Sequence, residues 1–165
     1  DQSQIESGQL HLKEEQYSPK ELVETIASNY LPMALQKGLS LHVDVSPSLP
    51  EKIVGDKSRV EQVLSNLVVN AIKFTQRGSI TVNAFKDGKT AWVLRVKDTG
   101  IGIAPENQER VFDAFRQVEE SATRKYGGVG LGLSIVQQLV FAMSGKISLE
   151  SKLGQGSTFT VTLPL

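Results

Sequence analysis

Hydrophobic residues recur along this chain with two different periods, and each period predicts one kind of secondary structure. Where apolar residues recur every three or four positions, the spacing is that of a helix with one buried face. Such helices are expected at residues 18–37, 58–75 and 131–143. Where apolar and polar residues alternate, the pattern predicts strands. The strands are expected at residues 39–45, 79–85, 91–97, 146–151 and 157–163.

Residues that favour the ends of helices separate these segments. Ser18 followed by Pro19 is typical of a helix N-terminus, and Gly38 favours the end of the same helix. Asp56 or Ser58 is expected to cap the second helix, because a short oxygen-bearing side chain can accept a hydrogen bond from a free backbone N–H group there.

The order of these elements predicts an α+β fold. Strands do not alternate regularly with helices, so a doubly wound parallel sheet is excluded. We expect a two-layer α/β sandwich in which three helices cover a mixed five-stranded sheet. The stretch between residues 98 and 129 is mostly polar and carries several glycines. A long irregular stretch of this kind favours a functional or mobile segment.

The composition is that of a single globular domain. The 165 residues are 39% hydrophobic, and 18 basic residues balance 18 acidic ones. Because the net charge is zero, electrostatic capture of a nucleic acid is disfavoured. With no cysteine and two histidines, the chain offers little for a thiolate or zinc site. Residues 51–165 nevertheless carry a net charge of +4, which suits an anionic ligand in that part.

The polar residues 1–17 are expected to be an incoming linker, and residues 18–165 one domain. The chain begins without Met and without an apolar signal segment, so we expect it to be an excerpt of a longer protein. No apolar run reaches the length of a membrane span, so no direct contact of this domain with a membrane is expected.

Polar residues of the second helix lie on one stripe. Asn66, Asn70 and Lys73 fall within about 60° of one another around the helix axis, and Gln62 joins them. Amide oxygens can coordinate a divalent cation, and an ammonium group can neutralise phosphate, so this stripe suits a metal–phosphate group. The alternative interpretation is an ordinary solvated face.

Asp98 ends a predicted strand on the same face as its apolar residues, where an unpaired carboxylate is costly. We therefore expect groups that donate hydrogen bonds to it. Gly100 and Gly102 follow, and they would let the backbone approach a flat ligand closely. An exocyclic amine of a nucleobase would suit the carboxylate. The alternative is an aspartate that caps a turn through its own side chain.

A run of glycines leads into the third helix, at positions 127, 128, 130 and 132. Glycine-rich backbone before a helix N-terminus exposes several N–H groups to an anion, and the helix dipole adds to the attraction. This pattern favours a phosphate site. The alternative is a flexible hinge.

Together these segments resemble four motifs of sensor histidine kinases, in the same order and spacing. The motifs are the N box at 66–75, the first glycine box at 98–103, the F box at 111–115 and the second glycine box at 126–136. The closing residues 154–165 and the opening residues 5–10 match as well. The chain thus resembles the ATP-binding catalytic domain of these kinases, which implies the Bergerat-type fold that gyrase, Hsp90 and MutL share.

The resemblance implies a role for each motif residue. Asn70 would ligate Mg²⁺ with help from Asn66, and Lys73 would reach the phosphates. Asp98 would accept a hydrogen bond from the adenine amine. The remaining nucleotide-binding positions are implied as two groups, near the base Gly100, Gly102, Ile103 and, through water, Thr158, and near the phosphates Gly128, Gly130, Leu131 and Gly132.

Residues 104–127 would form an ATP lid. Phe112 and Phe115 would anchor it, and Gln117 would lie near the γ-phosphate. The lid sequence at 115–128 resembles that of hybrid kinases. We therefore take Asn70, Lys73 and Gln117 as the catalytic set that the resemblance implies.

Asn66 separates two chemistries within this fold. The members that hydrolyse ATP carry glutamate four residues before the metal-binding asparagine, as a general base for water. This chain has Asn66 there, and a neutral amide cannot take a proton. A kinase does not need that base, because its nucleophile is an imidazole. The expected activity is therefore transfer of the γ-phosphoryl group, with Mg²⁺ and positioning as the main catalytic factors.

The acceptor histidine is missing, because neither His11 nor His42 lies in the acceptor setting of the family. Residues 1–10 resemble the end of the preceding dimerisation helix. The implied partners are this domain's own dimerisation and phosphoacceptor domain, in a homodimer, and a response regulator or receiver domain. The resemblance also implies a cytoplasmic domain, in a full-length protein that can be anchored in the inner membrane.

Two other interpretations stay open. The chain could be a nucleotide-poor relative that acts as a protein-interaction regulatory module, and Val129, where threonine is common, favours this slightly. It could also be an ATPase of the same fold, which Asn66 disfavours.

Overall fold

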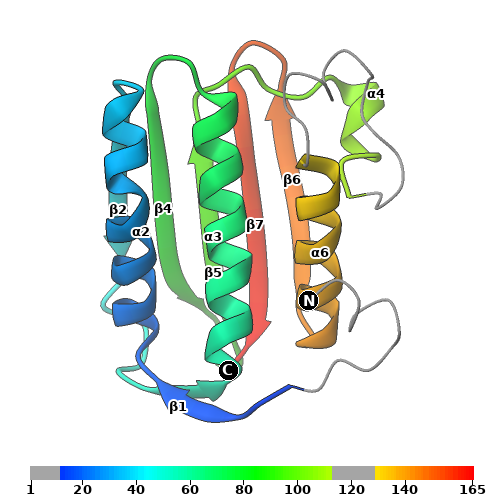
Figure 1. Ribbon diagram of the computed structural model, residues 1–165. Coiled ribbons are helices and arrows are strands. Elements are labelled where there is room, and N and C mark those ends of the chain that lie inside the picture. Colours follow the sequence, from blue (N-terminus) through cyan, green and yellow to red (C-terminus); the bar gives the residue numbers. More distant parts are fainter. Residues whose placement is uncertain (1–11, 113–128) are drawn as a thin grey trace.

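The computed structural model describes residues 12–112 and 129–165 as two layers, a sheet and a row of helices (Figure 1). The helices are α2 (Pro19–Gln36), α3 (Lys57–Phe74), α4 (Pro105–Gln108) and α6 (Val129–Ala142). The strands are β1 (Glu15–Tyr17), β2 (Ser40–Val45), β3 (Ile53–Gly55), β4 (Ser79–Asp87), β5 (Ala91–Asp98), β6 (Lys146–Lys152) and β7 (Gly156–Pro164).

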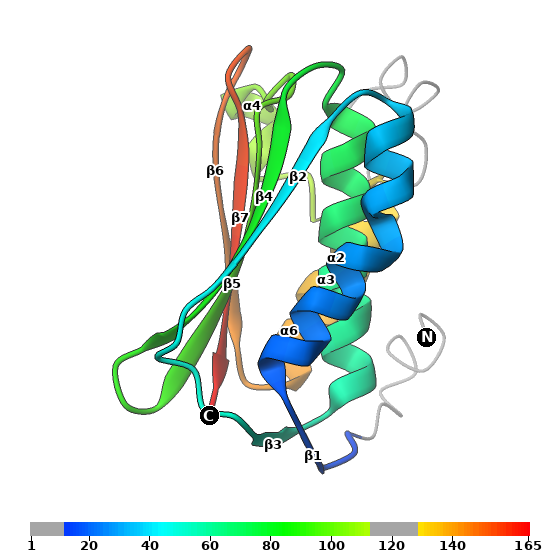
Figure 2. The ribbon, with the colours of Figure 1, turned by 90° about the vertical axis from the view of Figure 1, so that its left-hand side faces the viewer.

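Five strands form the main sheet in the order β2-β4-β5-β7-β6. β2 runs parallel to β4, and the other neighbours are antiparallel, so the sheet is mixed. Figure 2 shows that α2, α3 and α6 all lie on the same face of this sheet. The expected α+β sandwich, with three helices over a mixed five-stranded sheet, is confirmed.

The core lies between the two layers, and the period of two along the strands builds it. In β4, Ile80 and Val82 are fully buried, while the intervening Thr81 is only partly covered. α3 contributes the opposite wall with Leu64 and Leu67, both almost completely buried. Each such side chain stabilises the fold by roughly 1.5–3 kcal/mol through removal of apolar surface from water.

The helix starts follow the predicted capping chemistry. The Ser18 hydroxyl accepts a hydrogen bond of 3.1 Å from the N–H group of Glu21. Of the two candidate caps for α3, Asp56 takes the role and accepts a hydrogen bond of 3.2 Å from the N–H group of Arg59. After α2, Gly38 has a φ of 75°, a left-handed conformation that glycine adopts without strain.

A second, two-stranded sheet joins the entering chain to the start of α3 and was not predicted. β1 pairs antiparallel with β3, and Tyr17 at the end of β1 is 5% exposed and belongs to the core. Burial next to Asp56 raises the pKa of the Tyr17 hydroxyl. Strands of three residues are too short to show a period, which explains why sequence analysis missed them. The division into residues 1–17 and 18–165 stays a prediction.

Candidate functional site

The predicted polar stripe occupies the second half of α3, the central helix of the layer (Figure 1). α3 contacts α2 on one side and α6 on the other. Asn66 is half-buried, Asn70 is buried, and Lys73 is exposed. The stripe therefore runs from the edge of the core to solvent over two turns. One turn further towards the start of α3, the amide oxygen of Gln62 accepts a 3.2 Å hydrogen bond from Arg59.

The side-chain amide of Asn70 carries an unsatisfied hydrogen-bond donor. Its Nδ2 atom is buried and has no hydrogen-bond partner among the described residues. An unsatisfied buried polar atom costs about 1–3 kcal/mol, so such groups are usually kept for a purpose. Because the oxygen and nitrogen of an amide exchange places by a simple flip, the head group can turn either atom towards the unfilled position.

The last turn of α3 is held by groups from three segments. The Thr75 hydroxyl donates to the Ala71 carbonyl at 2.7 Å, and the Lys37 ammonium group donates to the Ile72 carbonyl at 2.7 Å. The Phe74 carbonyl accepts a hydrogen bond of 3.1 Å from the N–H group of Ile101. The N box is therefore bonded directly to the first glycine box.

Asp98 ends β5 beside this turn and is 5% exposed. Its Oδ1 atom accepts hydrogen bonds from the N–H groups of Gly100 at 2.9 Å and Ser157 at 3.3 Å. Burial raises the pKa of the Asp98 carboxyl, and these two hydrogen bonds act in the opposite direction. The bond from Gly100 is the turn cap that the sequence analysis gave as the alternative interpretation, and it leaves Oδ2 free of hydrogen bonds to the described residues.

The glycines of the first glycine box allow backbone segments to approach closely. A Cβ atom at Gly100 would collide with the carbonyl group of Phe74. A Cβ atom at Gly102, where φ is 73°, would collide with the carbonyl group of Lys152. These glycines are thus required for packing against α3 and against the β6–β7 hairpin, and they fix the position of Asp98.

Thr158 does not face Asp98, which corrects the expectation for this residue. Thr158 pairs with the exposed Lys97 on the uncovered face of the sheet. Ser157 pairs with Asp98 and is 6% exposed. The alternation with the core residue Phe159 could have identified Ser157, because residues two apart in a strand share a face.

The exit of the first glycine box is fastened to β6 by side chains that sequence analysis also missed. The Ser151 hydroxyl accepts a hydrogen bond of 2.8 Å from the N–H group of Ile103. The side-chain amide of Gln108 donates to the carbonyl groups of Ile103 at 2.9 Å and Ser151 at 3.0 Å. Ile103 is therefore held through its backbone from both sides.

The remaining predicted motifs are described only in part. Helix α6 begins at Val129, so Gly130, Leu131 and Gly132 lie in its first turn and not before it, which corrects the expected start at residue 131. In the F box, Val111 is buried and the ring of Phe112 meets that of Phe159 edge-on, with ring centres 6.1 Å apart. Outside the described residues lie Phe115, Gln117, Gly128 and most of the expected lid.

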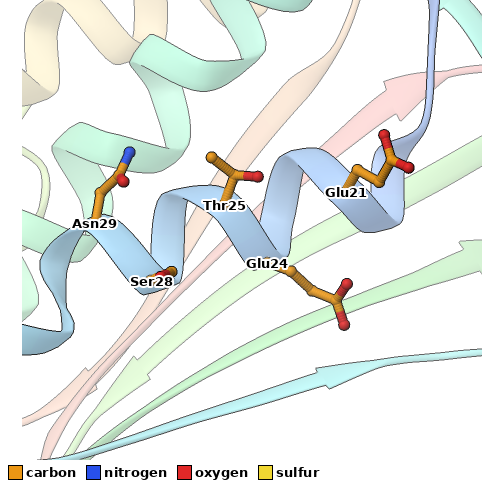
Figure 3. Close-up of a pocket in the computed structure, with 5 residues that line it drawn as sticks. All are labelled: Glu21, Glu24, Thr25, Ser28 and Asn29. Carbon is orange, nitrogen blue, oxygen red and sulfur yellow. The ribbon is translucent and has the colours of Figure 1, made fainter.

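A separate hollow lies on α2, and all of its lining side chains are exposed and polar (Figure 3). It is lined by Glu21, Glu24, Thr25, Ser28 and Asn29. None of them belongs to the predicted site, and the two carboxylates make this hollow unsuited to a phosphate group.

Comparison with known proteins decides the family. The family described as histidine kinase-, DNA gyrase B-, and HSP90-like ATPases matches residues 55–165. This chain belongs to that family. The match spans α3 with Asn66, Asn70 and Lys73, and it also includes Asp98.

Sensor histidine kinase RcsC of Escherichia coli K12 is 44% identical over 165 residues, which is all of this chain and 17% of RcsC. Hybrid signal transduction histidine kinase L of Dictyostelium discoideum is 40% identical over 168 residues, which is 99% of this chain and 10% of that protein. The chain therefore spans a small part of the curated relatives that it matches.

Among solved structures, that of full-length ShkA in complex with AMPPNP matches with a TM-score of 0.87 and 33% identity. The match covers 98% of this chain and 33% of ShkA. The ATPase family and its fold are thus established for this domain. Within residues 12–112 and 129–165, no helix has the length and apolar character to cross a membrane.

Proposed function

We propose that this domain binds Mg-ATP and, within a longer protein, donates the γ-phosphoryl group to a histidine on a separate dimerisation domain. The single observation that carries the proposal is the direct bond between the Phe74 carbonyl and the Ile101 N–H group. It holds the unpartnered amide of Asn70 and the open carboxylate oxygen of Asp98 at the same end of the domain. The match to an ATPase family supports the same function.

Asp98 recognises the base in this proposal. Its Oδ1 atom is occupied by two N–H groups, so its Oδ2 atom can accept a hydrogen bond from the exocyclic amine of adenine. Such a charge-assisted bond contributes about 1.5–3 kcal/mol. Gly100, Gly102 and Ile103 form the backbone around that end of the site, and Ser157 takes the place that was expected for Thr158.

The phosphates bind beside the last two turns of α3 and the first turn of α6. Lys73 is an exposed cation one turn beyond Asn70 and can neutralise phosphate charge. The first turn of α6, with Gly130, Leu131 and Gly132, offers backbone N–H groups to an anion. Among the described residues, a Cβ atom at Gly132 would meet nothing within 4 Å, which leaves room for a ligand there. Gly128 and Gln117 complete the proposed set.

A magnesium ion fits this site, with Asn70 as its protein ligand. Mg²⁺ is usually held by one or two protein oxygens together with phosphates and water, and the unpartnered amide of Asn70 supplies one such group. When bound, the ion would neutralise the charge on the phosphate oxygens. Among the described residues, no three His, Cys, Asp or Glu side chains gather to form a different metal site.

The proposed reaction needs no general base for water. The imidazole nitrogen of the acceptor histidine attacks the γ-phosphorus, the bond from that phosphorus to the bridging oxygen breaks, and ADP leaves. Asn66 is the residue in the position of the hydrolytic glutamate, and its neutral amide cannot activate water. Catalysis then depends on orientation by Asn70, Lys73 and Gln117 and on charge neutralisation.

The proposed partners are the dimerisation and phosphoacceptor domain of the same protein, as a homodimer, and a receiver domain or response regulator. We assign this domain to the cytoplasm, where ATP is available. The support is the similarity to sensor histidine kinase RcsC and to a hybrid histidine kinase, each of which is several times longer than this chain.

The binding step is tested by titration of the domain with a fluorescent ATP analogue, with and without Mg²⁺. We expect saturable binding between micromolar and millimolar nucleotide, and weaker binding without the metal. Asn70→Ala should lose the dependence on Mg²⁺. Asn29→Ala, an exposed asparagine on the neighbouring helix α2, is the matched control and should bind as the parent does. No saturable binding by the parent would refute the proposal.

The transfer step is tested in a chimera in which this chain replaces the matching segment of RcsC from E. coli. The chimera should become labelled from ATP that carries a radioactive γ-phosphate, and the label should be labile to acid and stable to base, as expected for phosphohistidine. Asn70→Ala in the chimera should abolish labelling. Rapid release of free phosphate without labelled protein would show a hydrolase instead.

A further inference from the structure

Three contacts converge on the hydroxyl oxygen of Ser151. It lies 2.8 Å from the backbone nitrogen of Ile103, 3.0 Å from the carbonyl oxygen of Gly156 and 2.8 Å from the hydroxyl oxygen of Ser157. A serine hydroxyl has one proton to donate and two lone pairs to accept with. All three places are used here, so the hydroxyl of Ser151 is fully occupied.

The chemistry of the partners fixes the direction of each bond. The Ile103 N–H group can only donate, and the Gly156 carbonyl can only accept. The single proton of Ser151 therefore goes to Gly156. Only a lone pair is left for the third contact, so the Ser157 hydroxyl must be the donor in its bond to Ser151.

The direction of the Ser157 hydroxyl determines what the site can recognise. Ser157 pairs with Asp98, and its N–H group donates to Asp98 Oδ1 at 3.3 Å. With its proton held by Ser151, the Ser157 oxygen has only lone pairs left to offer. The open Oδ2 atom of Asp98 is also an acceptor. The two side chains at this position therefore both accept from a ligand and do not donate to it.

We propose that Ser151 is a positioning residue that gives the site its preference for a 6-amino purine over a 6-oxo purine, by fixing the direction of the Ser157 hydroxyl. Adenine carries two donor hydrogens on its 6-amino group, and these match the acceptors. Hypoxanthine and guanine carry a carbonyl oxygen at that position, which meets lone pairs instead. The inference rests on the proposed binding of ATP, because it concerns the base in the same site.

The test compares the affinities for Mg-ATP and Mg-ITP, which differ in the base alone. The parent should prefer ATP. In Ser151→Ala the Ser157 hydroxyl is released and can turn to donate to the 6-oxo group. The ratio of the ITP dissociation constant to the ATP dissociation constant should then fall by about five- to tenfold, the value of one hydrogen bond. ITP also differs from ATP in its N1–H group. That difference is the same in the parent and in Ser151→Ala, so it does not affect the change in the ratio.

Three further variants separate selectivity from stability. Ser151→Thr keeps a hydroxyl with the same capacity and should restore the ratio of the parent. Ser148→Ala removes an exposed serine from the same strand and should leave the ratio unchanged. Ser157→Ala should lower the ratio while leaving the bonds of Ser151 to Ile103 and Gly156 in place, and adding Ser151→Ala to it should change the ratio no further.

A proportional loss of both affinities in Ser151→Ala, or an unchanged ratio in Ser157→Ala, would overturn the inference and leave Ser151 a structural residue. Ser157→Ala also serves as the deciding variant if Ser151→Ala does not fold. A parent that binds neither nucleotide is a different outcome, since it refutes the proposed function itself.

Discussion

Lys37 holds the end of a helix to which it does not belong: its ammonium group donates to the Ile72 carbonyl of α3 at 2.7 Å and approaches the Lys73 carbonyl at 3.4 Å. Lys37 is the C-cap residue of α2, so the bond joins the ends of two neighbouring helices. A cation at this place adds a hydrogen bond to the terminal carbonyl groups of the helix and is attracted by the negative end of the helix dipole.

Lys37→Met is expected to lower the free energy of unfolding by about 1 kcal/mol and to weaken binding of Mg-ATP, because the turn with Lys73 loses a fixed partner. Denaturation with urea and nucleotide titration measure the two effects. Lys37→Arg should recover most of both. Lys20→Met, an exposed lysine at the start of α2, is the control. Equal stability and affinity in Lys37→Met would show that the bond is unimportant.

Asp98→Asn should change stability with a definite dependence on pH. Burial raises the pKa of the Asp98 carboxyl in the folded state. The parent is therefore stabilised relative to the variant at low pH, where the carboxyl is neutral in both states. This advantage is lost as the pH rises through the folded pKa. Unfolding curves between acidic and neutral pH should show the stability of the parent falling relative to that of Asp98→Asn.

The same variant tests base recognition. Its oxygen can still accept from the N–H groups of Gly100 and Ser157, which leaves an NH₂ donor where Oδ2 was. We expect Asp98→Asn to fold, to lose affinity for ATP by tenfold or more, on the order of one charge-assisted bond, and to favour ITP relative to the parent. A variant that binds ATP as tightly as the parent would disprove the assignment of Asp98 to the base.

Gly100→Ala should be strongly destabilising, by about 1–3 kcal/mol, since the added Cβ atom collides with the Phe74 carbonyl. The collision separates the first glycine box from α3. The midpoint of urea denaturation measures the effect. Gly88→Ala is an informative comparison, because a Cβ atom there meets nothing within 4 Å and its cost comes only from a φ of 67°.

Gly132→Ala should separate stability from binding. The added Cβ atom meets none of the residues in 12–112 and 129–165 within 4 Å, and alanine favours a helix by about 1 kcal/mol over glycine, so the melting temperature should rise. If the phosphates approach this turn, the same Cβ atom should weaken binding of ATP and have little effect on adenosine. Unchanged ATP affinity in a stabilised variant would remove Gly132 from the proposed site.

Sequence patterns predicted the fold well because the main elements are long enough to show their periods. In α3 around Leu64 and in β4 around Val82, the apolar residues that recur with the predicted period are the buried ones, so the sequence pattern agrees with the observed burial. The short strands β1 and β3 have no such pattern. Their pairing depends on contacts between residues about 40 positions apart, which a local period cannot reveal.

The candidate site was predictable where a residue type itself indicates chemistry, as for Asn70 and Asp98. It was not predictable where chemistry depends on the direction of a hydrogen bond. Ser151 and Ser157 are ordinary serines in the sequence, and their importance comes from the partners that the β6–β7 hairpin brings to them. Thr158 was chosen by resemblance alone, against the alternation that assigns it to the opposite face of the sheet.

The strand β1 and the proposed nucleotide site lie at opposite ends of helix α3. The N–H group of Lys13 donates to the Asp56 carboxylate at 2.9 Å, which ties β1 to the first turn of α3, while Lys73 lies in its last turn. A helix of 18 residues is about 27 Å long and resists bending. A shift of Glu15–Tyr17 along β3 would therefore tilt or rotate α3 as a rigid body. The position of Asn70 would change with it, without any movement of the loops between the two sites.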